Sequence, residues 1–353
     1  MSTALNNLTN TLSSAISAGA VPGAALALVT PGHIETGYAG MRQLIPEVKP
    51  VEADTIYDMA SCTKVVSTTT LILQMLGDGI IQLNTPVSSI LTDFPHPEIT
   101  IQHLLTHTSG LPSDDKNYRT CHNKQEMRQF INHLDLVYKP GTEVMYSDFG
   151  FILLGFIIED KLGPLDQVAE KRIFQPLAMK DTCYCPDQHG LTDRCAATEQ
   201  KEGRGVIVGS CHDGKGWILN GVSGNAGLFS TANDIGRFAC IMLNEGELDG
   251  HRVLKKESVD LLKHCYTEGL NLRRTLGWFS NDPNQTDGSH ISSCCIYHTG
   301  FTGTSIYIDF VRSCAIVLLT NRVHPSRNNN AIMDLRRTIH DEALIAFDQG
   351  QWQ

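Results

Sequence analysis

The spacing of apolar side chains predicts a helix at the start of the chain. Leu5, Leu8, Leu12 and Ile16 recur about once per helical turn, with polar residues between them. Apolar residues at this spacing form one face of an amphipathic helix. The first element is therefore expected to be a helix that packs its leucine face against the rest of the protein.

Short β-rich runs at both ends of the chain predict strands. Residues 24–29 are apolar, a Pro-Gly pair follows, and residues 33–40 form a second run, which is typical of a hairpin. Residues 294–322 contain the runs CCIYHTG, TSIYIDF and CAIVLLTNR with turn residues between them. This pattern indicates a meander of antiparallel strands.

Helical patterns occupy most of the chain between these strands. Several of them begin after a capping residue such as Thr100 or Asn123, or end before Gly or Pro. Residues 183–222 are Gly-rich, polar and irregular, and we expect long loops there. The other predicted helices are residues 61–76, 101–107, 127–134, 149–162, 165–179, 232–246, 255–265 and 330–347.

These elements predict an α+β fold. An antiparallel sheet built from both termini is expected to be flanked by helices, with an all-helical insertion between its halves. We expect residues 1–75 and 220–353 to form an α/β sandwich domain and residues 76–219 to form a mainly helical inserted domain.

Charge and composition exclude several classes of partner. The chain has 28 Lys and Arg against 38 Asp and Glu, a formal net charge of −10, and no basic run. Nucleic acid and anionic membranes are therefore not expected as partners, because both are bound through basic patches. No segment approaches the ~20 apolar residues of a membrane span. The N-terminal segment lacks the pattern of a secretory signal, which favours a cytoplasmic location, or a periplasmic or secreted one if a leader was removed. The oligomeric state stays open.

Neither a metal nor a cofactor is expected. The 11 cysteines are odd in number and lack the spacing of zinc ligands, so we expect reduced, mostly buried thiols. HExxH, Walker and GxGxxG patterns are absent. His103 and His107 have a spacing that could ligate metal on a helix, but no third ligand is evident nearby. A structural role is the stronger interpretation of this pair.

The strongest candidate for chemistry is the segment Ser61-Cys62-Thr63-Lys64 at the start of a predicted helix. Residues at this spacing share a helix face, so the lysine amine can reach the serine hydroxyl. A serine hydroxyl is a weak nucleophile until a neighbouring base takes its proton. The pair therefore indicates a serine nucleophile, although the spacing alone also occurs often by chance.

Two further short segments strengthen this interpretation. Tyr146-Ser147-Asp148 opens an apolar predicted helix, and His298-Thr299-Gly300 lies on a predicted strand near the C-terminus. With Ser61 and Lys64 they resemble the three-motif set of the serine β-lactamase and penicillin-binding-protein superfamily. HLLTHTSGLP and GNAGLFSTANDIGRF also look like segments of that family. The resemblance is closest to the class C-like branch, with its family VIII carboxylesterases and D-amino-acid peptidases, and it implies the same sandwich with a helical insertion.

The resemblance also implies roles for individual residues. Ser61 would be the acylated nucleophile, Lys64 its proton acceptor or the group that tunes it, and Tyr146 a general base or proton shuttle. The backbone N–H groups of Ser61 and Phe301 would form the oxyanion hole. Asp148, His298, Thr299 and Gly300 would contact a small-molecule substrate. Which of Lys64 and Tyr146 takes the first proton is not readable from the sequence.

Two positions depart from the family pattern. The second motif usually ends in Asn, and here it ends in Asp148. An ionised carboxylate can only accept hydrogen bonds, so Asp148 should pair with Lys64 or with an amine of the substrate. The third motif of β-lactamases usually begins with Lys, and here it begins with His298, which is mostly neutral at pH 7. Both changes weaken recognition of an acylamino carboxylate.

Several functions therefore stay open. The first hypothesis is a serine hydrolase that forms an acyl-enzyme at Ser61 and acts on small esters, amides or β-lactams. The alternatives are a penicillin-binding D,D-carboxypeptidase or D-aminopeptidase, a penicillin sensor that acylates without deacylating, and a non-catalytic scaffold of the same fold. Retention of Ser61, Lys64 and Tyr146 argues against the scaffold.

Overall fold

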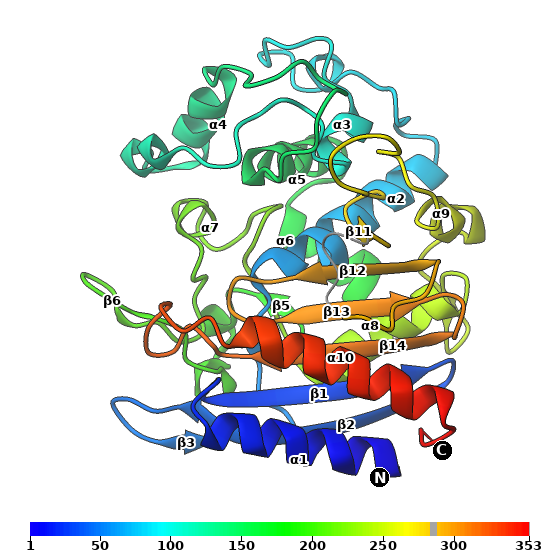
Figure 1. The fold of residues 1–353 in the computed structure, drawn as a ribbon. Helices are drawn as coiled ribbons and strands as arrows, with labels where there is room; N and C mark the ends of the chain where they lie inside the picture. Colours follow the sequence, from blue (N-terminus) through cyan, green and yellow to red (C-terminus); the bar gives the residue numbers. More distant parts are fainter. Residues whose placement is uncertain (283–287, 353) are drawn as a thin grey trace.

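The computed structural model describes residues 1–282 and 288–352. It is built on a seven-stranded sheet with the order β11-β12-β13-β14-β1-β2-β3 (Figure 1). Every pairing in this sheet is antiparallel, and β1 lies beside β14 with Ala24 opposite Thr320. The two ends of the chain therefore meet in one sheet, and the predicted α+β class is confirmed.

The strands of this sheet include both the predicted hairpin and the predicted meander. Their bounds are β1 Gly23–Thr30, β2 His33–Gln43, β3 Lys49–Pro50, β11 Phe279–Ser280, β12 Cys295–Thr299, β13 Ser305–Asp309 and β14 Cys314–Thr320. Shorter strands form three small sheets: β4 Tyr57–Asp58 and β5 Cys183–Tyr184 on either side of β8 Leu228–Ser230, β6 Gln200–Lys201 with β7 Gly205–Val206, and β9 Glu247–Leu248 with β10 His251–Arg252.

The helices in the described part of the chain cover both faces of the sheet and form the upper part of the molecule in Figure 1. Their bounds are α1 Thr3–Ser17, α2 Thr70–Gly77, α3 Ile101–Leu105, α4 Lys124–Asn132, α5 Asp148–Leu162, α6 Leu165–Ala169, α7 Gly214–Ile218, α8 Ala232–Leu243, α9 Lys256–Leu261 and α10 Ile332–Asp348.

Alternation along β1 explains why the sheet has a helical layer on each face. Successive side chains of a strand point to opposite faces. Leu26 and Leu28 pack in one core with the leucines of α1 and with α10, whereas Ala27 and Val29 pack in a second core with α8, α2 and α5. Figure 1 shows α1 and α10 side by side across the front of the sheet. The predicted amphipathic helix at the N-terminus is thereby confirmed.

The segment that begins at Ser61 is helical, as predicted, but it is not regular α-helix. It opens with a 3-10 turn at Ala60–Cys62, continues as π-helix at Lys64–Thr69 and becomes α2 at Thr70. The Thr70 hydroxyl donates to the carbonyl of Val65, five residues earlier. Every residue of the π-helical segment is buried. Because β-branched residues are weak helix formers, packing must hold this segment.

Two other sequence expectations need correction. The helix expected at 165–179 changes to π-helix after Ala169 and ends near Phe174. The region expected to be loops contains a short helix, α7, because the Asp213 side chain accepts a hydrogen bond from the N–H of Gly216 and caps it.

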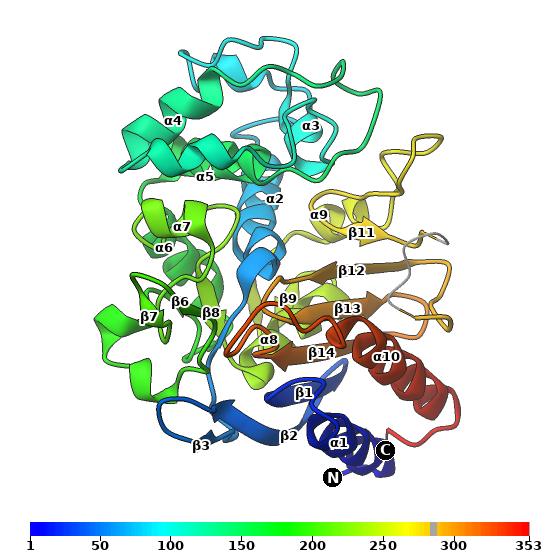
Figure 2. The same cartoon turned by 60° about the vertical axis from the view of Figure 1, so that its left-hand side comes forward.

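Figure 2 shows α3, α4 and α5 grouped away from the sheet. The division at residues 75 and 220 remains a prediction.

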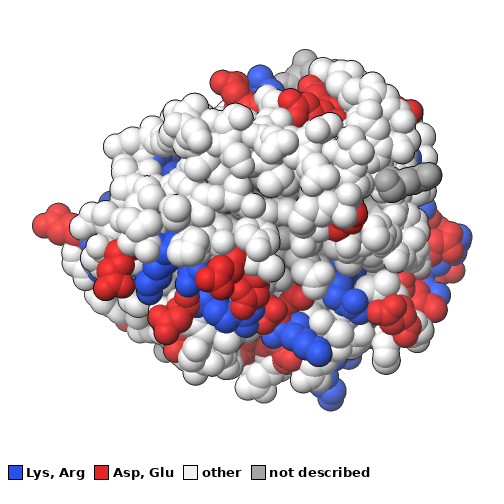
Figure 3. Space-filling view, turned by 90° about the horizontal axis from the view of Figure 1, so that it is seen from below, with Lys and Arg blue, Asp and Glu red and all other residues white. Residues whose placement is uncertain are grey.

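The surface and the helices bear on possible partners. Among the described residues, no helix combines the length and the apolar character needed to cross a bilayer. Figure 3 shows the face that lies below α1 in Figure 1, where basic and acidic side chains lie interspersed. That face offers no continuous basic patch of the kind that binds a phosphate backbone.

Candidate active site

Ser61 lies on a turn that a buried carboxylate holds in place. Ala60, the preceding residue, has a φ of 46°, a left-handed conformation that costs an L-residue about 1 kcal/mol. Asp58 accepts hydrogen bonds from the N–H of Ala60 and the N–H of His212, both at 2.8 Å. Burial raises the pKa of Asp58 to about 6. The sequence interpretation that Tyr57 and Asp58 shape the start of this helix agrees with these contacts.

Lys64 is fully buried and uses all three of its ammonium protons. It donates to Ser61 Oγ at 3.0 Å, to Asp148 Oδ1 at 2.8 Å and to the carbonyl of Asn225 at 2.9 Å. Burial alone would lower the pKa of Lys64, but the negative charge of Asp148 outweighs it and raises the pKa. Lys64 is therefore an ammonium group that donates to the serine and has no lone pair with which to accept its proton.

Asp148 bridges two lysines from distant parts of the chain. It lies in the first turn of α5 and accepts hydrogen bonds from Lys64 at 2.8 Å and from Lys215 of α7 at 3.1 Å. Burial would raise the pKa of Asp148, but the two ammonium charges outweigh it and lower the pKa to about 2. The predicted pairing of Asp148 with Lys64 is confirmed. The second amine that pairs with Asp148 is that of Lys215, a residue of the protein, and not an amine of the substrate.

Tyr146 is partly exposed and lies beside both members of the Ser61–Lys64 pair. Lys64 Nζ is 4.9 Å from the centroid of its ring. Burial raises the pKa of Tyr146, and the charge of Lys64 and the contacts with Lys64 and Ser61 oppose this only in part. The hydroxyl, the amine and the phenol expected to form the site thus lie together, although they come from distant parts of the chain.

Two neutral imidazoles flank the Tyr146 ring. The ring of His107 is 4.5 Å from it and the ring of His298 is 6.1 Å away, between centroids. Burial, followed by the charges of Arg274 and Lys64, lowers the pKa of each histidine well below its ordinary value. His298 Nδ1 lies 2.9 Å from the carbonyl of Thr299, so this nitrogen carries the proton and donates. His298 is therefore neutral, as the sequence led us to expect.

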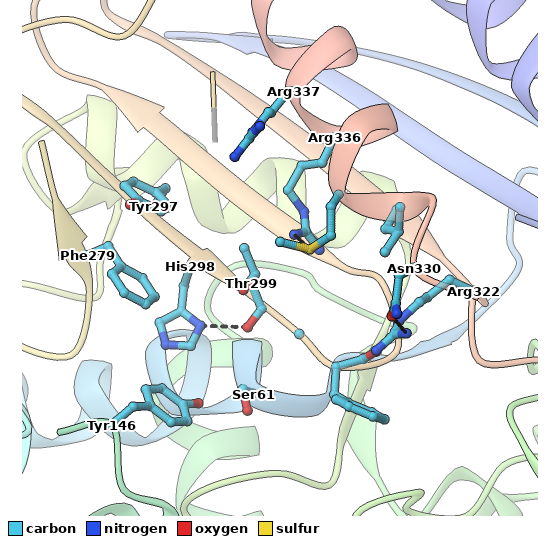
Figure 4. A pocket seen from close by; sticks show the side chains of 14 residues that line it. Ser61, Tyr146, Phe279, Tyr297, His298, Thr299, Arg322, Asn330, Arg336 and Arg337 are labelled. Atoms are coloured by element: carbon cyan, nitrogen blue, oxygen red, sulfur yellow. Dashed lines mark hydrogen bonds between the residues drawn. The ribbon is translucent and has the colours of Figure 1, made fainter. Parts of the chain in front are cut away.

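Ser61 lies between two cavities. The first has a volume of about 540 Å³ and the second about 610 Å³, and Ser61 and Phe301 line both. Figure 4 shows the first, with Tyr146, His298, Thr299 and the arginines of the C-terminal region around it. Its lining residues are Ser61, Tyr146, Phe279, Tyr297, His298, Thr299, Gly300, Phe301, Arg322, Asn330, Ile332, Met333, Arg336 and Arg337.

Short pairing of β11 leaves the end of β12 open to the first cavity. β11 pairs with Ile296 and Tyr297, so no strand in the described part of the chain covers that side of His298 and Thr299. His298 and Thr299 line the first cavity, and their contact with a substrate remains a prediction. The oxyanion hole at the N–H groups of Ser61 and Phe301 remains a prediction.

Gly300 has a packing role that the sequence did not reveal. A Cβ added there would lie 2.1 Å from Thr304 Oγ1 and 2.6 Å from the carbonyl of Met59. Real side-chain carbons do not approach other atoms so closely. Gly300 is therefore needed where the end of β12 packs against the turn before Ser61, and not only as space for substrate.

Several charged residues around the site were missed by the sequence analysis. Lys215 shares Asp148 with Lys64, and Arg274 contributes to the charge around Tyr146. Three arginines, Arg322, Arg336 and Arg337, line the first cavity. None of these residues belongs to a motif, and no local pattern in the sequence indicates that they converge on Ser61. Within residues 1–282 and 288–352, no group of three His, Cys, Asp or Glu side chains is arranged to hold a metal ion.

Comparison with known proteins identifies the family of this chain. A family model described as "Beta-lactamase" matches residues 8–338. N-acetylmuramyl-L-alanine amidase from Bacillus subtilis (strain 168) is 30% identical over 359 residues, which cover 89% of this chain and 81% of that protein. A Salmonella agona (strain SL483) protein, provisionally named a D-alanyl-D-alanine carboxypeptidase, is 33% identical over 305 residues, which cover 77% of this chain and 70% of that protein.

A solved structure shares the fold over almost its whole length. EstCE1, described as a hydrolase with promiscuous acyltransferase activity, matches with a TM-score of 0.74 at 21% sequence identity. The match covers 94% of this chain and 97% of that one. At this level of identity the likeness concerns the fold.

Proposed function

Because this chain belongs to the β-lactamase family and is a serine hydrolase, we propose that Ser61 is its nucleophile and forms an acyl-enzyme. The observation that carries the proposal is the 3.0 Å contact between the Ser61 hydroxyl and the Lys64 ammonium, at the wall shared by two cavities. A buried ammonium that donates to a cavity-lining hydroxyl stabilises the negative charge that develops on that oxygen during proton transfer.

Tyr146 accepts the serine proton in this mechanism. Lys64 cannot do so, because it is protonated and paired with Asp148. Burial raises the pKa of Tyr146, so the reactive protein is the fraction in which Tyr146 has released its proton to water. In acylation, a bond then forms between Ser61 Oγ and the carbonyl carbon while the Ser61 proton passes to the phenolate of Tyr146. The tetrahedral intermediate then collapses, and Tyr146 returns the proton to the departing nitrogen or oxygen. In deacylation, water repeats the attack with Tyr146 again as acceptor, and Ser61 leaves with the proton.

The position of Tyr146 indicates which part of the substrate each cavity holds. Tyr146 lines the first cavity and not the second. The group that receives a proton from Tyr146 must lie beside its hydroxyl. The leaving group therefore occupies the first cavity, and the acyl group occupies the second.

The first cavity favours a leaving group with negative charge. Arg322, Arg336 and Arg337 line it, and no Asp or Glu is among its described lining residues. Guanidinium groups bind carboxylates in paired hydrogen bonds. We therefore infer that the substrate is an amide or ester whose leaving group carries a carboxylate, such as an amino acid or short peptide. The names of the two relatives both include an alanine unit, which is consistent with an amino acid or a peptide as the leaving group.

A labelling experiment tests the nucleophile. The protein is incubated separately with a fluorophosphonate, p-nitrophenyl acetate and nitrocefin, and each product is weighed intact and after digestion. We expect a fluorophosphonate adduct on the peptide that contains Ser61 and turnover of the ester. The Ser61→Ala variant, which keeps both cavities, is the control and should show neither.

Other outcomes would select the alternatives. Absence of any adduct and of any turnover would overturn the proposal in favour of the non-catalytic scaffold. A penicillin adduct that persists for hours would indicate the sensor. Release of a terminal D-amino acid from a peptide would agree with the carboxylate-bearing leaving group inferred above and would identify the enzyme as a carboxypeptidase.

A further inference from the structure

Arg274 is a fully buried cation beside the proposed active site. Only 1% of it is exposed, and it lies in the segment that leads into β11. Its guanidinium carbon is 3.8 Å from the centroid of the Phe279 ring and 6.0 Å from that of Tyr146. The backbone N–H of Arg274 donates to Thr267 Oγ1 at 2.7 Å, which ties the main chain in place. The guanidinium is therefore stacked on Phe279 and lies near Tyr146, and both of these rings line the first cavity.

No carboxylate neutralises this guanidinium in the described part of the chain. Its guanidinium donates a hydrogen bond to the carbonyl of Gly277 at 3.3 Å, and its Nε has no hydrogen-bond partner among the described residues. An ionised group buried without a counter-ion is strongly unfavourable, and proteins retain one mainly where function needs it. Burial lowers the pKa of Arg274 to about 10, and the groups that oppose this are two phenols, Tyr146 and Tyr297.

We propose that Arg274 is a positioning residue for catalysis, a second cation that stabilises the phenolate of Tyr146 together with Lys64. This inference rests on the proposed function, in which that phenolate accepts the serine proton. The charge of Lys64 is balanced by Asp148 at 2.8 Å. Arg274 has no such carboxylate among the described residues, so its charge is available to the Tyr146 phenolate that must be present before the serine proton is transferred.

The other titratable groups around Tyr146 do not supply this charge. The groups that face its ring from neighbouring elements are Lys64, Asp148, His107, His298 and Arg274. Both histidines are neutral, and Asp148 is an anion that disfavours a phenolate. Among these five groups, Arg274 is thus the cation that has no carboxylate partner in the described part of the chain.

The pH dependence of Ser61 labelling tests the inference. Rate constants for reaction with a fluorophosphonate are measured from pH 6 to 10 for the intact protein, for Arg274→Gln and for Arg274→Met, which packs well against aromatic rings. Loss of a nearby opposite charge should raise the midpoint of the alkaline rise by about one pH unit. Labelling at pH 7.5 should then be about tenfold slower, and the difference should shrink as the pH rises.

A neighbouring arginine supplies the matched control. Arg273 is 38% exposed in its side chain and pairs with Glu268 at 2.6 Å, so Arg273→Gln removes the same charge one position away. This variant should label like the unmodified protein at every pH. Adding His298→Lys to Arg274→Gln should restore part of the lost rate, because the new ammonium would extend from a position whose present ring lies 6.1 Å from that of Tyr146.

The outcomes separate this inference from the proposed function. An unmodified protein that does not label at Ser61 would overturn the proposed function itself. Labelling of the unmodified protein with an unchanged midpoint in both Arg274 variants, or with a rate lowered equally at all pH values, would overturn the role of Arg274 alone. If the glutamine variant does not fold, judged by its circular dichroism and melting temperature, the methionine variant decides by the same criteria.

Discussion

The two cavities that meet at Ser61 differ in how their charges are compensated. In the first, Arg322, Arg336 and Arg337 lie in the wall, and no Asp or Glu is among the described lining residues. In the second, charges are paired: Glu199 contacts Arg327 at 2.6 Å and His212 at 2.9 Å, and Lys215 contacts Asp114 at 2.7 Å. One cavity therefore offers positive charge to a substrate, whereas the charges of the other are largely satisfied within the protein.

This difference indicates in which part of the substrate a negative charge favours binding. A cation already paired with a carboxylate gains little from a second anion, because the first must be displaced or shared. A cavity wall that holds arginines and no described acidic side chain binds an anion more favourably. We therefore expect negative charge to matter in the leaving group and to matter little in the acyl group. The net charge of −10 makes the contrast sharper, since the arginines lie in a protein that otherwise repels anions.

The largest effect should follow loss of the residue common to both cavities. Ser61→Ala should reduce turnover by about 10⁴-fold or more, because no other nucleophile replaces the hydroxyl. Both cavities remain, so substrate binding measured by calorimetry should persist. Turnover within about tenfold of the unmodified protein would contradict the role of Ser61.

The next largest effect should come from replacing Asp148, which pairs both with Lys64 and with Lys215 of the second cavity. Asp148→Asn leaves Lys64 and Lys215 without their shared anion and should lower the free energy of unfolding at pH 7 by about 3 kcal/mol. The native pKa of Asp148, about 2, lies below its ordinary value. Its stabilising contribution is therefore complete at neutral pH and is lost as the pH falls from about 4 toward 2.

Urea unfolding at pH 7, 5 and 3 measures this contribution. The difference between the unmodified protein and Asp148→Asn should be similar at pH 7 and 5 and smaller at pH 3. Asp114→Asn is the control, because its side chain is 51% exposed and contacts only Lys215 of the two lysines. It should change stability by less than about 1 kcal/mol. A difference for Asp148→Asn that grows at low pH would contradict the assignment.

A smaller effect should distinguish the cavities directly. Arg337 is exposed at the first cavity, and Arg337→Gln should raise KM about tenfold for a thioester whose leaving group is thioglycolate, since a charged hydrogen bond contributes about 1.5 kcal/mol or more. The same thioester with thioglycolamide as leaving group should be unaffected. Arg204→Gln, in the second cavity, should leave the ratio of the two KM values unchanged. Equal losses for both thioesters would contradict the assignment of the leaving group.

The smallest effect should come from removing Glu199, the acidic partner of Arg327 in the second cavity. Glu199→Gln would free Arg327, which the carboxylate now holds through both of its oxygens. We expect kcat/KM for a succinyl ester to rise about threefold relative to the acetyl ester, because uncompensated positive charge attracts an anionic acyl group. An unchanged ratio, measured with the melting temperature as a check on folding, would show that pairing does not decide the preference.

Periodicity and local spacing allowed much of the fold and the centre of the site to be predicted. Short apolar or β-rich runs separated by turn residues identified the hairpin and the meander, and the helical spacing of Leu5, Leu8 and Leu12 identified α1. The spacing of Ser61 and Lys64 predicted their contact, because residues three apart share a helix face. The charge of Asp148 predicted its pairing with Lys64. Each of these inferences depends on chemistry or on neighbours close along the chain.

The tertiary structure alone decided which other charges surround the nucleophile. Arg274, Lys215 and the arginines near the C-terminus come from loops and helices whose positions depend on long-range packing. The same holds for Gly300, whose need for a missing side chain arises from contact with Met59 on a distant segment. The sequence by itself determined the fold class and the Ser61–Lys64 pair, because periodicity is a local property. The three-dimensional arrangement decided where charge is balanced, because that depends on residues far apart in the chain.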